Sequence, residues 1–364
     1  MTKQQEIKYD YIIAGSGCAG LSLLYRILNE QSLNKKNILV IDKNQKNIND
    51  RTWCFWENKE GIFNSIVTHK WNTLEFLNPD FTQRFDLKYC TYKMIKGIDF
   101  YNHIFSFARK FENVTFKYEK IVQIQAENDC VMLETENNKY FSDYIFNSTN
   151  LFNPQINTSD TLLQHFEGWI IKTVKPTFNS KIGTLMDFRI NQEFGTTFMY
   201  ILPTSSNEAL IEYTLFSEKI LDKEKYEKEL KSYIENYLKA DQYEILHKEF
   251  GVIPMSINKF SRKLSSNKNI INIGTAGGFT KASTGYTFQF IQKNTSKIIE
   301  NLKKGKHPNI KITFREKMFQ WYDRTLLEVI ISKKMTGIEI FSIMFKKISP
   351  EKILSFLGNE SKFT

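Results

Sequence analysis

Cysteine is scarce and unpaired in this sequence of 364 residues. The four cysteines are Cys18, Cys54, Cys90 and Cys130, and their spacing contains neither a CxxC pair nor a metal-binding pattern. This spacing argues against a disulfide framework and against a zinc site. We therefore expect four free thiols, a reducing compartment and no metal.

Long hydrophobic runs are also missing. No run of about eighteen apolar residues occurs, which excludes a helix that spans a bilayer. The first six residues lack the apolar core of a signal peptide, and we find no internal repeat and no low-complexity tract. We expect a cytoplasmic protein that contacts a membrane only from its surface.

Charge and aromatic content narrow the choice of partners. Fifty Lys and Arg residues against forty Asp and Glu residues leave a net charge of +10, spread along the chain. An anionic membrane or an anionic cofactor explains this excess as well as nucleic acid does, and we expect no nucleic acid. Thirty Phe and seventeen Tyr residues either fill a core or line a long apolar cavity.

A glycine motif near the start predicts a dinucleotide site. The apolar run 9–14 leads into Gly15, Gly17 and Gly20 with GxGxxG spacing, and a helical pattern follows at once. Gly15 permits a tight turn, Gly17 lets the backbone approach a pyrophosphate, and Gly20 lets helix and strand pack closely. A second apolar run ends at Asp42, where a carboxylate can bind ribose hydroxyls. FAD and NAD both fit this pattern.

A second glycine-rich segment repeats the same strand, loop and helix order. The apolar run 269–273 leads into a loop that begins at Gly274 and continues to Gly285 and Tyr286. Helix N-termini and successive backbone N–H groups bind anions. We therefore expect this loop to approach the cofactor as well.

The segments between these motifs predict a second, β-rich unit. Residues 73–77, 81–87, 168–174, 182–190, 197–202 and 209–216 have strand character. Residues 98–109 and 221–238 have helical patterns, as does most of 312–357. Within the last segment, apolar residues 338–345 lie between lysine pairs, which fits either an interfacial helix or a plain core helix.

Several of these stretches together resemble the flavoprotein lycopene cyclases, in particular the bacterial lycopene β-cyclases. The resemblance extends in family order over about residues 9–295. Its segments are the glycine turn, Asp50-Arg51-Thr52-Trp53-Cys54-Phe55-Trp56, Gln164-His165-Phe166-Glu167-Gly168-Trp169, Leu185-Met186-Asp187-Phe188-Arg189, Leu210-Ile211-Glu212-Tyr213-Thr214, Gly251-Val252-Ile253-Pro254-Met255, and Gly274-Thr275-Ala276-Gly277-Gly278 running into Gly285-Tyr286-Thr287.

The resemblance implies FAD, active in its reduced form, at the N-terminal site. Only sixteen glycines occur and no second GxGxxG exists, so NAD(P)H is expected as a transient reductant. Many flavoproteins carry Gly-Asp where this chain has Gly274-Thr275, so the loop backbone must replace that carboxylate. The expected cofactor-binding residues are Gly15, Gly17, Cys18, Ala19, Gly20, Asp42, Lys43, Arg51, Thr52, Thr275, Ala276, Gly277, Gly285 and Tyr286.

The family's reaction is a redox-neutral isomerisation in which the acyclic end groups of lycopene close to β-ionone rings, through γ-carotene to β-carotene. It needs an acid, a base and stabilisation of a cation in an apolar pocket. Glu212 matches the family's glutamate and is the expected acid, since burial raises a carboxyl pKa. Asp187 is expected to assist as base or orienting group, although a simple pair with Arg189 explains it equally well. The expected substrate-contacting aromatics are Trp53, Phe55, Trp56, Tyr200, Tyr213 and Phe288.

The sequence thus predicts an α/β protein in which a Rossmann-type FAD-binding domain (GR2-like) is interrupted by an antiparallel β-sheet substrate domain. The expected function is lycopene β-cyclase, peripherally bound to a membrane. An FAD- and NAD(P)H-dependent monooxygenase or reductase acting on another isoprenoid, and a non-catalytic carotenoid-binding flavoprotein, are the alternatives. The expected ranges are 1–60, 95–155 and 250–305 for the FAD domain, 61–94 and 156–249 for the substrate domain, and 306–364 for a helical C-terminal region.

Overall fold

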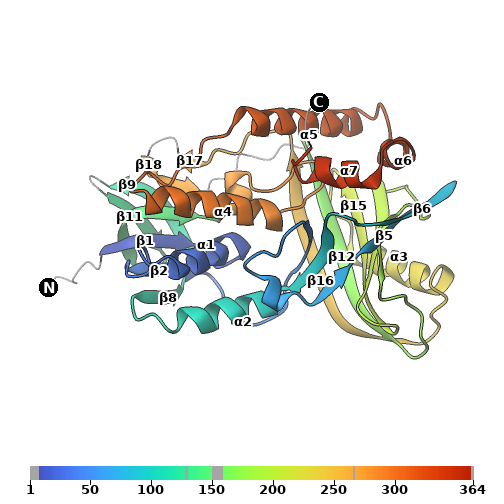
Figure 1. Ribbon diagram of the computed structural model, residues 1–364, viewed down its shortest axis with the longest axis horizontal. Helices are drawn as coiled ribbons and strands as arrows, with labels where there is room; N and C mark the ends of the chain where they lie inside the picture. Colours follow the sequence, from blue (N-terminus) through green and yellow to red (C-terminus); the bar gives the residue numbers. More distant parts are fainter. Residues whose placement is uncertain (1–7, 128–129, 150–158, 265–266, 362–364) are drawn as a thin grey trace.

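The computed structural model describes residues 8–127, 130–149, 159–264 and 267–361. Two large β-sheets form the two ends of the molecule, and helices lie beside and above them (Figure 1). The glycine motif belongs to one end and Glu212 to the other. The site therefore depends on how the two ends meet.

The first sheet has eight strands, five of them parallel in the order β18, β11, β1, β2 and β8. Apolar runs such as β1 and β2 suit parallel strands because both faces of such a sheet are covered. The strands are β1 (Lys8–Ala14), β2 (Ile38–Asp42), β8 (Val114–Tyr118), β9 (Ile121–Glu127), β10 (Cys130–Thr135), β11 (Lys139–Asn147), β17 (Lys263–Leu264) and β18 (Asn267–Asn272).

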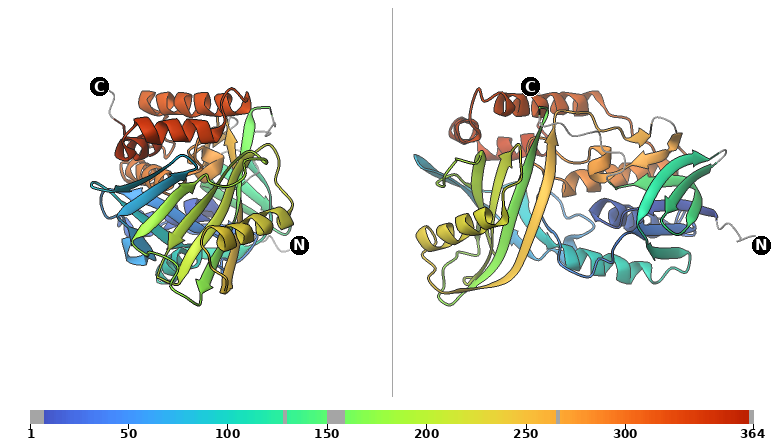
Figure 2. Two further views of the ribbon diagram at one scale, coloured as in Figure 1. Left: turned by 90° about the vertical axis from the view of Figure 1, so that its right-hand side faces the viewer. Right: turned by 180° about the vertical axis from the view of Figure 1, so that it is seen from behind.

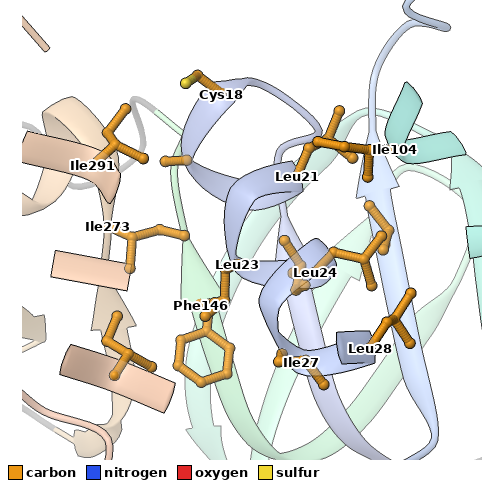
Figure 3. Close-up of a cluster of buried hydrophobic side chains, with 14 of the residues drawn as sticks. Cys18, Leu21, Leu23, Leu24, Ile27, Leu28, Ile104, Phe146, Ile273 and Ile291 are labelled. Atoms are coloured by element: carbon orange, nitrogen blue, oxygen red, sulfur yellow. The ribbon is translucent and has the colours of Figure 1, made fainter. Parts of the chain in front are cut away.

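Helices cover one face of this sheet, and the antiparallel strands β9 and β10 cover the other (Figure 2). The helices are α1 (Cys18–Asn29), α2 (Gly97–Ala108) and α4 (Phe288–Lys303). Apolar residues of α1 recur every three or four positions, so Leu24, Ile27 and Leu28 share one buried face. Figure 3 shows this face between Phe146 of β11 and Ile104 of α2.

The second sheet has seven strands in the order β16, β12, β15, β14, β13, β5 and β6. Its neighbours are antiparallel except for the parallel pair of β13 and β5. Helix α3 (Lys223–Asn236) packs Tyr226, Leu230 and Tyr233 against one face of it. The strands are β5 (Thr73–Asn78), β6 (Phe81–Asp86), β12 (Thr161–Thr173), β13 (Ile182–Asp187), β14 (Thr196–Pro203), β15 (Glu208–Ser217) and β16 (Tyr243–Ser256).

A small sheet and the C-terminal helices connect the two ends. The small sheet consists of β3 (Thr52–Glu57), β7 (Thr91–Lys96) and β4 (His69–Trp71), in that order. Helices α5 (Phe314–Ile331), α6 (Gly337–Lys347) and α7 (Pro350–Leu357) follow α4 and lie across the top of the molecule in Figure 1. Thr313 and Thr336 form capping boxes at the starts of α5 and α6, which explains where these helices begin.

The predicted architecture is confirmed, with two differences in the second sheet. Strand β12 begins at Thr161, well before the expected start at residue 168. Strand β16 is absent from the prediction, because its first half is charged and its second half contains Pro254, both unfavourable signals for a strand. Strand β16 crosses the domain boundary expected between residues 249 and 250. Strand β7 crosses the domain boundary expected between residues 94 and 95.

Helix α6 packs one face against the second sheet. Its Phe345 ring stacks on Phe76 of β5 with 4.2 Å between centroids, and Phe341 stacks on Phe188. Both phenylalanines of α6 are buried. Of the helices in the described ranges, none combines the length and the apolar character needed to cross a membrane.

Candidate functional site

A cavity of about 780 Å³ lies where the two ends of the molecule meet. Its walls come from the glycine turn, from β3, from the loop that begins at Gly274, and from five strands of the second sheet, β12 to β16. Cavities of this size commonly hold cofactors and drug-sized ligands. The cavity therefore joins the predicted cofactor site to the predicted substrate site.

The glycine turn has the geometry that a dinucleotide phosphate requires. Gly15 has φ +98°, a conformation that L side chains rarely adopt, and a Cβ atom on Gly20 would lie 2.0 Å from the Gly15 carbonyl oxygen. A Cβ atom on Gly17 would meet no described atom within 4 Å. Gly17 is also the N-cap of α1 and offers no capping side chain, so the N–H groups of the first turn face open space.

Asp42 closes the turn from the end of β2. Its Oδ2 atom accepts hydrogen bonds from the Ser16 backbone N–H at 2.7 Å and from the Ser16 hydroxyl at 3.0 Å. Asp42 and Lys43 both line the cavity. A carboxylate here both fixes the turn and faces the position expected for a ribose.

The loop after β18 forms the opposite wall. Gly274–Gly277 form a short 3-10 helix, and Gly278 and Gly285 both have positive φ values. A Cβ atom on Gly285 would lie 2.3 Å from Oε1 of Gln164, a residue of β12, so only glycine allows this approach. The loop thus touches the second sheet beside the cavity.

The polar groups in the cavity fit a dinucleotide such as FAD. The Oγ1 atom of Thr284 and the Oε1 atom of Gln164 are buried at the cavity wall and lack hydrogen-bond partners among the described residues. Unpartnered buried polar atoms are rare in folded proteins and indicate a missing ligand or water. Together with the open phosphate position at Gly17, they leave both backbone and side-chain groups for the cofactor.

Glu212 lies on the cavity face of the second sheet. Cross-strand pairing sets Tyr200 of β14, Glu212 of β15, Gly168 of β12 and Glu249 of β16 in one row. Paired residues of neighbouring strands point to the same face. Leu210 and Thr214 also line the cavity, which confirms the alternation expected along β15.

Glu249 is the second carboxylate of this row. Its side chain is 6% exposed, and its Oε2 atom accepts a hydrogen bond from Thr52 Oγ1 at 2.7 Å. Gly168 lies between the two glutamates, and a Cβ atom there would approach Glu249 Cγ to 3.2 Å. The missing side chain at Gly168 therefore makes room for both carboxyl groups on one face.

Burial raises the pKa of both carboxyl groups. The pKa of Glu212 rises to about 8, mainly because protein surrounds the carboxyl group and secondly because Glu249 is near. A hydrogen bond from Thr214 at 2.5 Å opposes part of this rise. The pKa of Glu249 rises to about 7 through burial, against the opposing effects of Thr52 and Arg51. At neutral pH, Glu212 is mostly protonated.

Three tyrosines meet beside this row. The hydroxyl of Tyr200 contacts that of Tyr286 at 2.9 Å and also that of Tyr92. Burial raises the pKa of Tyr286 to about 12 and raises the pKa values of Tyr92 and Tyr200 well above the usual tyrosine value, so all three stay neutral. The rings of Tyr200, Tyr286 and nearby phenylalanines supply neutral aromatic faces to the cavity.

Comparison with known protein families gives a match over residues 10–363 to the family described as "Lycopene cyclase protein". This match covers nearly the whole chain. The chain belongs to the lycopene cyclase family. Among curated individual proteins, no sequence matches it.

Solved structures with this fold are flavoproteins of low sequence identity. A flavin-dependent brominase, Bmp2, has a TM-score of 0.65 at 12% identity, covering 97% of this chain and 94% of that one. The p-nitrophenol 4-monooxygenase PnpA of Pseudomonas putida has a TM-score of 0.67 at 11% identity, covering 99% and 100%. HpxO of Klebsiella pneumoniae, in complex with FAD and uric acid, has a TM-score of 0.66 at 11% identity, covering 98% and 97%. This lycopene cyclase family member therefore has the fold of FAD-binding flavoproteins.

Most of the predicted site residues of this lycopene cyclase family member meet in the one cavity. The cavity is lined by Gly15, Gly17, Cys18, Ala19, Asp42, Lys43, Arg51, Thr52, Trp53, Tyr200, Glu212, Thr275, Gly285, Tyr286 and Phe288. Gly20 lies beneath the turn, and Ala276 and Gly277 are buried in the loop away from this cavity. Of the predicted loop residues Thr275, Ala276 and Gly277, only Thr275 lines this cavity.

Asp187 does not reach the cavity of this lycopene cyclase family member. Its register partner on β14 is Met199, which pairs with Tyr213, so Asp187 and Tyr213 lie on the α3 face of the sheet. Asp187 is fully buried and binds Arg189 at 2.7 Å and the Tyr233 hydroxyl at 2.5 Å. The pair with Arg189, the alternative left open by the sequence, is present.

Three of the predicted substrate aromatics also lie away from the cavity wall. Phe55 is buried and stacks on Phe288 with 4.4 Å between centroids. Trp56 packs edge-on against Tyr286 at 4.6 Å, behind the wall. Tyr213 is buried under α3. These rings support the wall, whereas Trp53, Tyr200 and Phe288 form part of it.

Glu249 is the carboxylate of the site that the sequence prediction missed. The prediction did not recognise β16 as a strand, and without the pairing of β16 with β12 nothing places residue 249 beside residue 212. Gly251, two residues after Glu249, reveals this packing only in the structure, where an added Cβ would lie 2.3 Å from the Phe166 ring. A glycine that accommodates a ring across a strand pair indicates a packed sheet position.

Proposed function

We propose that this chain is a lycopene β-cyclase that uses reduced FAD and catalyses an isomerase reaction without net electron transfer. The observation that carries the proposal is Glu212, a carboxyl group kept protonated at neutral pH in the cavity that also contains the dinucleotide turn. A redox cofactor site beside a proton donor suits a reaction that needs charge stabilisation and acid catalysis together.

FAD would be held by groups from the glycine turn, from the end of β2 and from the loop after β18. The free N–H groups after Gly17 would bind the pyrophosphate, Asp42 the ribose, and the backbone at Thr275 the flavin side of the cofactor. When bound in its reduced, anionic form, FAD supplies negative charge that stabilises a nearby cation. NAD(P)H would act only as a transient reductant.

Glu212 would donate its proton to the terminal double bond of an acyclic end group. The resulting tertiary cation is attacked by the next double bond, the ring closes, and one ring proton passes to the carboxylate that Glu212 became in the first step, so atoms and electrons balance and the acid is restored. Glu249 favours the protonated form of Glu212, because a second carboxylate nearby disfavours ionisation. Thr52 holds Glu249 in place.

The apolar wall would stabilise the cation and exclude water. Phe166, Phe198, Phe216, Tyr200 and Trp53 line the cavity, and aromatic faces attract cations. Their neutral rings offer no nucleophile comparable to water, which would otherwise capture the cation. A C40 hydrocarbon dissolves in a bilayer and not in water, so we also propose that the protein meets its substrate at a membrane surface.

The experiment is anaerobic incubation of the FAD-loaded protein with lycopene in liposomes and NADPH, followed by chromatography of the pigments. We expect monocyclic and bicyclic carotenes with no NADPH consumed in proportion to product. Oxygenated or reduced products with stoichiometric NADPH use would instead support the monooxygenase or reductase. Flavin-loaded protein that leaves lycopene unchanged would contradict the proposal.

Replacing the proposed acid gives the most direct test. Glu212→Gln removes the transferable proton but keeps size and hydrogen bonding, so we expect turnover to fall by about a hundredfold or more. Flavin content and carotene binding should stay unchanged. Gln123→Glu is a matched control, because residue 123 is on β9, outside the cavity, and is exposed. Full activity of Glu212→Gln would contradict the assigned role.

A further inference from the structure

A second cavity, of about 900 Å³, lies behind the loop that follows β18. Thr275 lines both cavities, whereas Gly277 and Gly278 line only the second, so this loop separates the two. The other walls come from residues 254–262, from α4 and from α5. None of the reaction steps described above uses this space.

Positive charge prevails at this second cavity, which eight Lys and Arg side chains line against three carboxylates, those of Glu316, Asp323 and Glu360. Two of its cations are paired, Lys281 with Asp323 at 2.5 Å and Arg324 with Glu328 at 3.3 Å. Its other cationic side chains are Lys259, Arg262, Lys293, Lys297, Arg315 and Lys317. Only one further salt-bridging carboxylate, Glu316, is within 4 Å of any of these six in the described part of the chain.

Arg262 is the buried member of this group. Its side chain is 9% exposed, and Nη2 lies 3.6 Å from Glu316 Oε1, an oxygen that also binds Lys297 at 3.2 Å. The other oxygen of Glu316 caps α5 through Thr313. Nη1 of Arg262 is buried and lacks a partner among the residues that the structure describes. Among the described residues, the buried guanidinium of Arg262 therefore has only one nearby carboxylate, and it shares that carboxylate with Lys297, so its charge is incompletely balanced.

A second buried polar atom accompanies this guanidinium. Asn294 of α4 is 4% exposed, and its Oδ1 atom is also unpartnered within the described ranges. It lines the same cavity as Arg262. The site therefore offers a charged donor and a neutral acceptor, which suits a phosphate ester that also carries a hydroxyl group.

The remaining wall and rim are apolar. Phe260 and Phe290 line the cavity, and so does Trp321 of α5, which is 60% exposed. Phe314, seven residues before Trp321 and therefore on the same side of α5, is 83% exposed. Exposed aromatics beside cationic side chains match the two parts of an amphiphile with a charged head and an apolar tail.

We propose that this second cavity binds a phosphorylated amphiphile, with the phosphate on Arg262 and the apolar part against Trp321 and Phe314. The ligand is either a phospholipid headgroup in a membrane or a free lipid phosphate, since both carry the same groups. The inference goes beyond the proposed cyclase activity and does not depend on it. Its test measures binding, so its failure is distinct from a failure of catalysis.

The experiment uses the full-length, FAD-loaded protein and two lipid probes. Calorimetry measures binding of dihexanoylphosphatidylglycerol, a soluble short-chain anionic lipid, with dihexanoylphosphatidylcholine, a zwitterionic lipid without net charge, as the control. Co-sedimentation measures binding to vesicles of phosphatidylglycerol or of phosphatidylcholine. We expect saturable binding of the anionic lipid and weaker binding at high salt, because salt screens exposed charges.

Variants locate the site. Arg262→Gln should weaken binding of the anionic lipid by about tenfold or more, because it removes a charged hydrogen-bond donor. Lys293→Glu should weaken it as well, and this exposed side chain leaves the core intact. Arg109→Gln changes an exposed arginine outside both cavities and should have no effect.

The outcomes separate the two ligand sources and test the site itself. Loss of both soluble-lipid and vesicle binding in the two cavity variants supports the site and identifies membrane lipid. Loss of soluble-lipid binding alone, with no vesicle binding by any variant, supports a free lipid phosphate. Absence of binding to both the soluble lipid and the vesicles, or equal binding by Arg262→Gln, Lys293→Glu and Arg109→Gln, would overturn the proposal.

Discussion

Gly168 allows two glutamates to face one cavity. Glu212 and Glu249 are both register partners of this residue, on the strands to either side of β12. Adjacent strands lie about 4.8 Å apart, so the two backbones are roughly 10 Å apart, within reach of two long side chains that lean together. A carboxyl group in such a site titrates as part of a pair.

Removing the charge of Glu249 should make Glu212 a stronger acid. Glu249 raises the pKa of Glu212, so Glu249→Gln should lower that pKa by about one unit. Turnover requires protonated Glu212 and falls as pH rises through its pKa of about 8. The variant should therefore lose kcat/KM at lower pH than the wild type does. A pH–rate profile measures this shift, and an unchanged profile would show that the two groups act independently.

Helix α1 and the turn before it place two glycines under different constraints. A Cβ atom would clash with backbone at Gly20 but would meet open space at Gly17, whose φ of −80° suits any residue. The same motif therefore contains one glycine that the fold requires and one whose open space is available to a ligand.

This difference predicts contrasting results for two alanine variants. Gly20→Ala should lower the thermal midpoint strongly, because its Cβ would be 2.0 Å from an oxygen atom. Gly17→Ala should fold normally but lose about tenfold or more in FAD affinity, because the new methyl group occupies the phosphate position. Thermal melts and flavin titration measure both properties. Normal FAD affinity in Gly17→Ala would contradict the assigned phosphate position.

Asp187 ties β13 to α3 and should act on stability. Asp187→Asn removes the charge that binds Arg189 and weakens the contact with Tyr233 of α3. We expect a loss of about 1–3 kcal/mol in the free energy of unfolding, measured with denaturant. The pH–rate profile should keep its shape in the folded fraction. A changed profile at normal stability would restore the catalytic role for Asp187.

Across the whole molecule, the two ends are joined through the site itself. Thr52 belongs to the small sheet and Glu249 to the second large sheet, 197 positions apart in the chain. Arg51 donates to the carbonyl oxygen of Phe250 at 3.1 Å, and Gly285 touches Gln164. Cofactor-side and substrate-side groups therefore share contacts with the titrating pair.

This connection predicts an effect of Thr52 on the acid. Thr52→Val keeps the shape but removes the hydrogen bond that lowers the pKa of Glu249. Glu249 then carries less charge at neutral pH, so the pKa of Glu212 should fall by roughly half a pH unit. The high-pH loss of activity should move in the same direction as in Glu249→Gln, by a smaller amount. Thr325→Val, on the exposed side of α5, is the control and should leave the profile unchanged.

Local patterns in the sequence determined the dinucleotide turn and the direction of Glu212. The dinucleotide motif lies within about 35 residues and consists of a strand, three glycines and the carboxylate of Asp42. All of these belong to one βαβ unit, so the motif can be recognised without knowing how distant segments pack. Alternation along β15 likewise placed Leu210, Glu212 and Thr214 on one face, because successive strand residues point to opposite sides.

Only the tertiary structure decided which residues join Glu212. Strand pairing between distant segments sets Glu249 beside it and turns Asp187 and Tyr213 to the α3 face. A shift of register by one residue reverses every side chain of a strand, and the sequence pattern of β13 or β16 alone does not specify that register. The resemblance to the family therefore pointed to Glu212 as the proposed acid, whereas the position of Glu249 beside it depended on the assembled sheet.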